Sequence, residues 1–527
     1  RRLPAGSRIL IAEPDRELFE WALESVYLSD ILQHEGVRLV VGDELELVRE
    51  LQRLGVAILS LQPRICVHPV LARVLPDVYR RWQDVIRGEF NRILLDTATT
   101  IYWDLTWGKN TMENLPQVLA SYPGKRLFDK FRGVPCVIVS AGPSLDRNAD
   151  ALHAVLGRAL VIAVGTALKA LRFHGVNPNL IVSYDGGEGN YRHFQGECYD
   201  DIPLVYDPMI YPAIPREHGG KKWIIETTSN PFMRWLREPL GSPGVVASGG
   251  SVATVALDLA VRMGCNPLIL VGQDLAFREG HTHARGTVYE DRQIEESSFG
   301  ASPQYMRVPA VDGGTVWTSR AWYGFLTWFE RYIAAAPSHL RFIDATEGGA
   351  LIRGTEVMPL RDAIRSVCRF PVPVREILEL AMREPSRMAS ASELRTYLEE
   401  GANSLRTASR IARRAAEWAE EAETLAKLGK GDSGRMRRLL KALDRADHII
   451  QRLDPHLLRL IELSAYASAL RVVRMSGKTI DGNTSNDTLH AAPALERSRE
   501  LYEAVATAAK RTAETISGGI NVLNELD

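Results

Sequence analysis

The stretch VIVSAGPSLDRNADAL, residues 137–152, predicts a strand, a tight turn and a helix in direct succession. Its first residues continue a buried apolar strand, and its last residues have the apolar spacing of an amphipathic helix. In the turn, Gly142 is expected at the helix N-cap and Pro143 at the first helical position, where proline is favoured. The free backbone N–H groups of such a helix start attract phosphate, and Ser144 adds a hydroxyl donor. Taken alone, however, the turn is better explained as a connection that binds no ligand.

The surrounding residues predict a Rossmann-like α/β fold. Strands are expected at residues 136–141, 159–164, 180–183, 204–206, 223–226 and 268–271, and helices at 145–156, 167–173 and 251–262. Continuous apolar strands that alternate with helices indicate a parallel, doubly wound sheet covered on both faces. Ligands of such sheets bind beyond the carboxyl ends of the strands.

Polar and glycine-rich segments follow these strands and are candidates for a nucleotide site. They are Thr166, Asp185, Gln273 and Asp274, together with a second glycine-rich helix start at Ser248, Gly249, Gly250 and Ser251. Each acid alone is explained equally well as an N-cap or a loop anchor. The set as a whole favours a nucleotide at the carboxyl edge of the sheet.

Several well-known nucleotide motifs are absent. The chain has no G-x-x-x-x-G-K-[ST] sequence, which excludes a P-loop NTPase. It has no G-x-G-x-x-G at the first turn, which argues against a dinucleotide enzyme. No tight D-x-D pair is present near these strand ends, so the sequence requires neither a metal nor a cofactor.

At 527 residues the chain is too long for one core, and we expect three domains. Residues 1–125 predict a small α/β domain with strands at 9–12, 37–41 and 56–61 and a helix at 70–97. Residues 126–370 hold the central Rossmann-like domain. Residues 371–527 predict helices at 393–426, 435–453, 455–473 and 493–524, with a polar loop at 476–490. The seven-residue pattern of small residues within 393–426 predicts a helical hairpin or bundle.

The bulk composition is that of a soluble globular protein. Lys plus Arg number 64 and Asp plus Glu 65, a formal net charge of −1, so a general nucleic-acid or anionic-membrane binder is not indicated. The five cysteines are scattered without a C-x-x-C pair, as in reduced cytoplasmic proteins. No apolar run reaches the roughly 18 residues of a membrane span, and residues 1–7 lack the apolar core of a secretion signal. We expect a cytoplasmic location.

Five segments resemble the central domain of the motility-associated-factor (Maf) flagellin glycosyltransferases. They are VSAGPSLD (139–146), VSYDGG (182–187), SGGSVATVALDLAVRMGCNPLILVGQDLAF (248–277), HTHARG (281–286) and IDATEGGALIRGTE (343–356). The expected three-part layout matches this family, and the central domain is also similar to bacterial sialyltransferases that use CMP-sialic acid. The resemblance covers most of the chain.

The resemblance implies a donor, an acceptor and a binding site. The donor would be CMP-activated nonulosonic acid of the pseudaminic or legionaminic type, and the acceptor a Ser or Thr of flagellin, modified in the cytoplasm. The C-terminal helices would help to dock flagellin. Gly142, Pro143, Ser144 and Leu145 would hold the phosphate and ribose, and Ser248, Gly249, Gly250 and Ser251 the rest of the nucleotide, with Thr166, Asp185 and Gln273 in the same pocket and Asp274 closing it.

The catalytic half of the resemblance is weaker. The sialyltransferase tyrosines near the G-x-D strand and the histidine base have no counterparts at residues 268–271 and 316–320. His283 is our leading candidate for the base, with His281 behind it. Glu347 is expected to bind a sugar hydroxyl or to act as the base itself, and Asp274 is also expected among the catalytic residues. His281 and His283 are also explained as loop residues or, less well, as metal ligands. Arg285 and Arg320 are expected to balance the acidic sugar or the leaving phosphate, or to be ordinary surface charges.

Two other functions remain open from the sequence. The central domain also resembles archaeal pterin diphosphokinases, which transfer pyrophosphate from ATP with magnesium but are much shorter. The departures in the catalytic half also fit a non-catalytic flagellin-binding protein that retains a nucleotide-like pocket.

Overall fold

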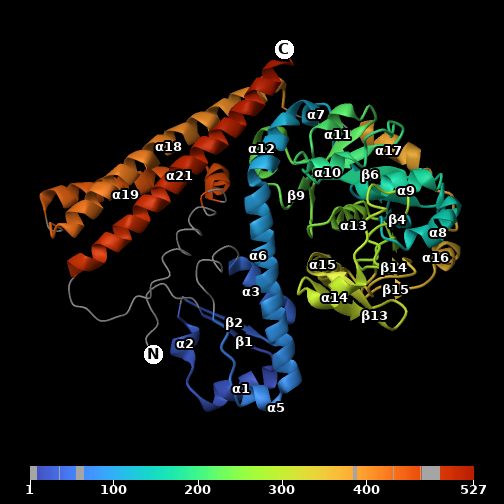
Figure 1. Ribbon diagram of the computed structural model, residues 1–527, viewed down its shortest axis with the longest axis horizontal. Coiled ribbons are helices and arrows are strands. Elements are labelled where there is room, and N and C mark those ends of the chain that lie inside the picture. The colour runs from blue at the N-terminus through green and yellow to red at the C-terminus, as the bar shows by residue number, and fades with distance from the viewer. Residues whose placement is uncertain are drawn as a thin grey trace. The chain divides into compact units, whose positions relative to one another are not determined.

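The computed structural model describes residues 9–34, 36–54, 64–383, 389–430, 433–462, 465 and 487–526 (Figure 1). The chain forms two compact units, which divide between Tyr102 and Trp103. The helices of the C-terminal part belong to the second unit, together with the large sheet.

The first unit is a small α/β arrangement. Strand β1 (Ile9–Glu13) pairs in parallel with β2 (Val37–Val41), as the apolar runs predict. The helices are α1 (Arg16–Ser25), α2 (Ser29–Leu32), α3 (Glu44–Leu54), α5 (Leu71–Val74) and the start of α6 (Pro76–Glu113). Val40, Leu47, Leu51 and Trp82 form its core. The predicted strand at 56–61 lies outside the described residues. Helix α6 is longer than the predicted 70–97 and continues into the second unit.

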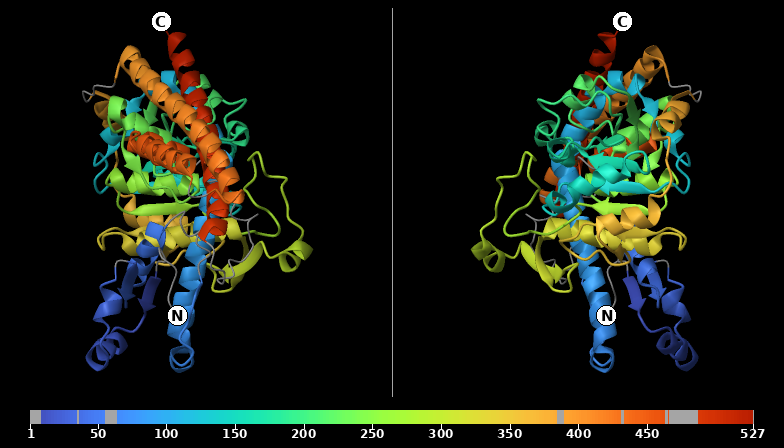
Figure 2. Two further views of the ribbon diagram at one scale, coloured as in Figure 1. Left: turned by 90° about the vertical axis from the view of Figure 1, so that its left-hand side faces the viewer. Right: turned by 90° about the vertical axis from the view of Figure 1, so that its right-hand side faces the viewer.

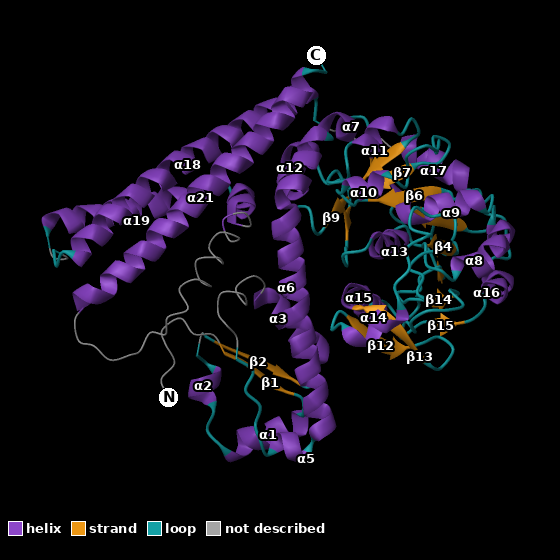
Figure 3. Ribbon diagram, viewed as in Figure 1, coloured by secondary structure: helices purple, strands orange, loops and turns teal. Residues whose placement is uncertain are grey.

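The second unit is built on a nine-stranded sheet in which all pairs are parallel, confirming the predicted Rossmann-like α/β fold (Figure 3). In spatial order the strands are β15 (Glu356–Val357), β14 (Phe342–Asp344), β11 (Leu268–Val271), β4 (Cys136–Val139), β5 (Leu160–Val164), β6 (Leu180–Ser183), β7 (Leu204–Tyr206), β8 (Lys222–Ile224) and β3 (Tyr122–Pro123). Strands β4, β5, β6 and β11 are buried along their whole length, which explains their continuous apolar sequences.

The order of strands places a topological switch point beside β4. From β4 the chain proceeds to β5, β6 and β7 on one side, and later returns to β11 and β14 on the other. Because parallel crossovers are right-handed, the helices of the two halves cover opposite faces, and ligands of such folds bind beyond the strand ends at this switch point. Helix α13 (Val252–Arg262) packs against β4, β5, β6 and β11 and covers one face.

Short elements connect the strands. They are α7 (Leu115–Leu119), α8 (Leu145–Asn148), α9 (Leu168–Phe173), α10 (Glu188–Tyr191), α11 (Ala213–Glu217), α12 (Pro231–Leu240) and α16 (Leu360–Val367), and the paired strands β9 (Glu226–Thr227) and β10 (Val245–Val246). The predicted strand at 223–226 is thus divided between β8 and β9, which belong to different sheets.

A hairpin follows β11 that the sequence analysis did not anticipate. Strands β12 (Tyr305–Pro309) and β13 (Thr315–Ser319) pair in antiparallel fashion between α14 (Glu296–Ala301) and α15 (Arg320–Ala335). The rings of Tyr305 and Trp317, from the hairpin, pack with the rings of Phe277, Phe299 and Trp322. The yellow-green segment that contains α14 projects from the rest of this unit (Figure 2). The D-G-G sequence at 312–314, a turn signal between apolar runs, would have predicted this hairpin.

Long helices complete the second unit. They are α17 (Val374–Arg383), α18 (Ala391–Lys427), α19 (Gly434–Gln451) and α21 (Asp487–Asn524). Helices α18 and α21 pack together, and α18 turns a seam of buried alanines inward, as its seven-residue pattern predicts. Residues 487–490, predicted as loop, are helical, and of the predicted helix 455–473 the described residues 455–462 are helical. No described helix combines the length and the hydrophobicity that crossing a bilayer requires.

Candidate functional site

The turn after β4 does not open a long helix, so the prediction that Gly142 is an N-cap and Pro143 the first helical residue is wrong. Helix α8 begins at Leu145 and spans four residues, and a 3₁₀ helix follows at Ala149–Val155. The N–H of Leu145 donates to the carbonyl of Gly142 at 3.0 Å, which makes residues 142–145 a reverse turn. A four-residue helix has a small dipole, so the dipole argument for phosphate binding at this turn loses its basis.

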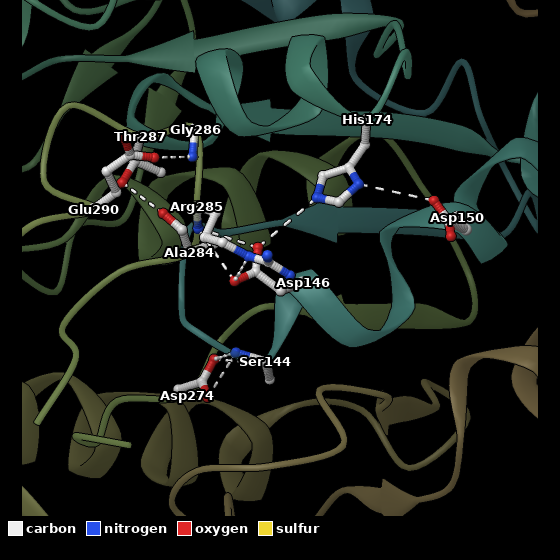
Figure 4. A network of polar contacts seen from close by, with 10 residues as sticks. All are labelled: Ser144, Asp146, Asp150, His174, Asp274, Ala284, Arg285, Gly286, Thr287 and Glu290. Carbon is white, nitrogen blue, oxygen red and sulfur yellow. Dashed lines mark hydrogen bonds and ion pairs between the residues drawn. The ribbon is translucent and has the colours of Figure 1, made fainter. Parts of the chain in front are cut away.

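The carboxylate of Asp274, at the end of β11, binds the hydrogen-bond donors of this turn. The backbone N–H of Ser144 donates to Asp274 Oδ1 at 3.2 Å, and the Ser144 hydroxyl donates to Oδ2 at 2.7 Å (Figure 4). Both side chains are buried. The structure therefore brings two predicted site residues together, but as partners of each other. A phosphate could reach these donors only if Asp274 moved.

Burial dominates the electrostatics of Asp274. Burial raises its pKa to about 7, the hydrogen bonds from Ser144 oppose this, and the nearby Asp344 carboxylate adds to the increase. Gln273, the preceding residue, accepts a hydrogen bond from the Ser140 hydroxyl at 2.6 Å. Leu145 is fully buried beside this pair of strand ends. These contacts join the segments that follow β4 and β11.

The second glycine-rich segment precedes α13, as predicted, and Ser251 is the N-cap residue rather than the first helical residue. Glycine is required at position 249 because a Cβ there would lie 2.4 Å from the Trp328 ring. The Ser248 hydroxyl lies 3.1 Å from the hydroxyl of Tyr184, the residue before Asp185. Gly250, with φ 89°, continues the loop toward Ser251. The segment 248–251 therefore lies next to the end of β6.

Asp185 is the predicted site carboxylate that remains open to solvent. It follows β6, its side chain is exposed, and its Oδ1 accepts a hydrogen bond from the Gly187 N–H at 2.9 Å. Surrounding protein still raises its pKa by desolvation. Asn110 of α6 fixes this turn by donating to the Gly186 carbonyl. Thr166 lies half-buried after the neighbouring strand β5.

The loop of residues 281–293 crosses over the turn after β4. The N–H of Ala284 donates to the Ala141 carbonyl at 2.9 Å, and the N–H of Arg285 donates to Asp146 at 3.1 Å. The Arg285 guanidinium lies 3.4 Å from the same carboxylate, which also faces His174 (Figure 4). The Arg285 charge is thus already paired, although its side chain is exposed.

His283 is in the same loop, and its environment favours the neutral imidazole. Burial, aided by Arg292, lowers its pKa to about 4. Its Nδ1 lies 2.9 Å from the Thr282 hydroxyl, which itself donates to the Arg292 carbonyl. Because that hydroxyl has one proton, it accepts from Nδ1–H, and the lone pair is on Nε2. His281, by contrast, contacts the Gln293 amide through Nε2.

Glu347 and Arg320 make hydrogen bonds to the backbone of neighbouring segments. Glu347 Oε1 accepts the N–H of Leu360, the first residue of α16, at 2.9 Å. Arg320, the first residue of α15, donates from Nε to the Pro303 carbonyl at 2.7 Å. The described contacts of Arg320 are with the hairpin rather than with the turn after β4.

Replacing Glu347 with alanine is expected to lower the free energy of unfolding by about 1 kcal/mol, since it removes the cap of α16. Glu347→Gln keeps an acceptor oxygen and should retain most of that stability, and urea unfolding of both variants measures the difference. If Glu347 were also the proton acceptor of the reaction, the glutamine variant would lose its activity at near-normal stability.

Three residues that the sequence analysis missed lie around His283. His193 and His283 both contact the Tyr289 ring, at centroid distances of 5.3 and 5.0 Å. Lys169 is close enough to His193 to lower its pKa. Lys169 stands three residues after Thr166, near the start of α9, a spacing that places it by the same sheet edge. No sequence signal marked His193.

Comparisons with known proteins are consistent with this architecture. A family model described as 6-hydroxymethylpterin diphosphokinase MptE-like matches residues 109–280. An uncharacterized protein of Treponema pallidum (strain Nichols) is 29% identical over 133 residues, 22% of this chain, and the match spans a third (33%) of that relative's length. The structure of a MAf glycosyltransferase from Magnetospirillum magneticum AMB-1 superposes with a TM-score of 0.58 over 99% of this chain and 78% of the other. At 14% identity this likeness shows a common fold.

Proposed function

We propose that this chain is a glycosyltransferase that moves a nonulosonic acid, of the pseudaminic or legionaminic type, from a CMP-sugar to Ser or Thr hydroxyls of flagellin. The observation that carries the proposal is the likeness in fold to the MAf glycosyltransferase, which extends over 99% of the chain. The quoted motifs, which lie between residues 139 and 356, support the donor and acceptor classes.

The geometry of the carboxyl edge suits such a transfer. Removing the proton of an acceptor hydroxyl requires a neutral imidazole or a free carboxylate near the donor. Asp185 presents such a carboxylate, open to solvent, and we assign it as the proton acceptor; His283 is neutral in the absence of an anion, with its lone pair on Nε2. We therefore place the donor sugar nucleotide near Asp185 and Ser248, at the carboxyl ends of the strands. The N–H and hydroxyl of Ser144 are not available to it because they already donate to Asp274.

Intact-mass measurement of flagellin, incubated with this protein and CMP-pseudaminic or CMP-legionaminic acid, tests the proposal. We expect the mass to increase by whole sugar units. Asp185→Asn should reduce the rate by at least about tenfold, since it removes the open charge. Asp312→Asn is the matched control because Asp312 is also exposed and accepts the N–H of the glycine two residues on. Unmodified flagellin with both donors would contradict the proposal.

The family-model match at residues 109–280 favours a second candidate, a pterin diphosphokinase. This activity would transfer pyrophosphate from ATP, with magnesium, to 6-hydroxymethylpterin. Thermal stabilisation by CMP but not by Mg-ATP supports the glycosyltransferase, and the reverse supports the kinase. Tight flagellin binding without any mass change or donor hydrolysis would indicate a non-catalytic flagellin-binding protein.

A further inference from the structure

Four basic side chains converge where the 281–293 loop meets the end of the sheet. His283 and Arg292 come from the loop, Lys169 comes from α9, and His193 follows α10. The Tyr289 ring contacts both imidazoles. We call His193, His283, Lys169 and Arg292 the basic cluster.

Among the described residues, no carboxylate balances the positive charge of this cluster. Burial lowers the pKa of His193 to about 4, aided by His283 and Lys169, and burial aided by Arg292 lowers the pKa of His283 to about 4. No carboxylate among the described residues contributes to either shift. The nearby loop carboxylate of Glu290 instead accepts the N–H of Gly286. Within the described part of the chain, neither Lys169 nor Arg292 has an ion-pair partner.

Unused hydrogen-bonding atoms point to a ligand. His193 is only 3% exposed, and its Nδ1 is buried without a hydrogen-bond partner. Leaving such a group without a partner costs free energy unless a ligand supplies one. In His283, the bond from Nδ1 to Thr282 leaves Nε2 available.

We propose that the basic cluster binds a carboxylate or phosphate group of the ligand, with His193 and His283 taking up protons as the anion enters. An anion next to a neutral imidazole favours its protonated form, and the imidazolium then donates a charge-assisted hydrogen bond. Lys169 and Arg292 supply permanent charge. This inference deepens the proposed function, on which it rests only for the identity of the ligand: an acidic activated sugar carries both groups.

The test follows the imidazole signals of the full-length protein, labelled with ¹³C-histidine, at pH 6. Of the 12 histidines, His193 and His283 are assigned with the variants H193Q and H283Q. Without an added anion we expect both rings to be neutral at pH 6. Saturating inorganic phosphate or acetate should protonate at least one of them, and the effective anion identifies the group that the cluster prefers. Unchanged signals with every anion overturn the proposal, and this result needs no variant to fold.

Binding measurements separate the failure of this proposal from that of the proposed function. Lys169→Gln should weaken phosphate binding by about tenfold or more, whereas H339Q, which alters an exposed histidine before β14, should leave it unchanged. Equal weakening in both variants contradicts the assignment. If CMP binds but neither phosphate nor acetate protonates an imidazole, the basic cluster is refuted and the donor class stands. If phosphate protonates them but CMP does not bind, the cluster stands and the donor class is refuted.

Discussion

Gly142→Ala is expected to lower the free energy of unfolding by about 3 kcal/mol or more, because no space exists for a side chain. A Cβ at this position would lie 2.0 Å from Asp274 Oδ2 and 2.5 Å from the Gly272 carbonyl oxygen. Neither neighbour can yield easily. The carboxylate is held by two bonds from Ser144, and the carbonyl accepts the N–H of Gly142 itself at 2.8 Å. Urea unfolding followed by circular dichroism measures the loss.

Gly324→Ala is the matched control for this prediction. Gly324 lies within α15 and a Cβ there meets nothing within 4 Å, so alanine should leave stability unchanged or raise it by up to about 1 kcal/mol. Similar unfolding curves for the two variants would show that the turn after β4 has more room than the contacts indicate.

The strands of the sheet were predictable because burial on both faces leaves a continuous apolar signal. Strands β6, β7 and β11 have the predicted bounds, and β4 and β5 differ from them by one or two residues. The hairpin β12–β13 was missed because only two of its strand residues, Val308 of β12 and Thr318 of β13, are buried, so its apolar signal is weak. The sequence also did not predict that α6 continues beyond residue 97 to Glu113.

The candidate site was predicted as a set of residues but not as an arrangement. The sequence identified Ser144 and Asp274 as neighbours of one crevice, because each follows a buried strand. That they bind each other depends on a contact across 130 residues of sequence, which no local pattern records. The same contact fixes Ser144 in a turn, so that helix α8 begins at Leu145 rather than at Pro143. His193 lies in the site because its ring packs on Tyr289, a residue that is again distant in the sequence.

Asp274→Asn is expected to change how stability depends on pH, by on the order of 4 kcal/mol between pH 4 and pH 8. Burial raises the pKa of Asp274 to about 7 in the folded chain, whereas an unfolded aspartate has a pKa near 3.9. Between these values the unfolded chain releases a proton that the folded chain keeps, so wild-type stability falls as pH rises from about 4 to about 7. Three pKa units correspond to about 4 kcal/mol.

The asparagine variant has no such titration, and its amide oxygen can still accept from Ser144. Relative to the wild type, it should therefore gain stability steadily as pH rises through this window, whatever its stability at pH 4. Urea unfolding of both proteins at four pH values measures the difference, and the exposed Asp312→Asn variant supplies a control that should track the wild type. A constant difference between Asp274→Asn and wild type would mean that Asp274 ionises in the folded chain as readily as in the unfolded one. Its carboxylate would then have to be hydrated, and the Ser144 donors would be accessible to a phosphate after all.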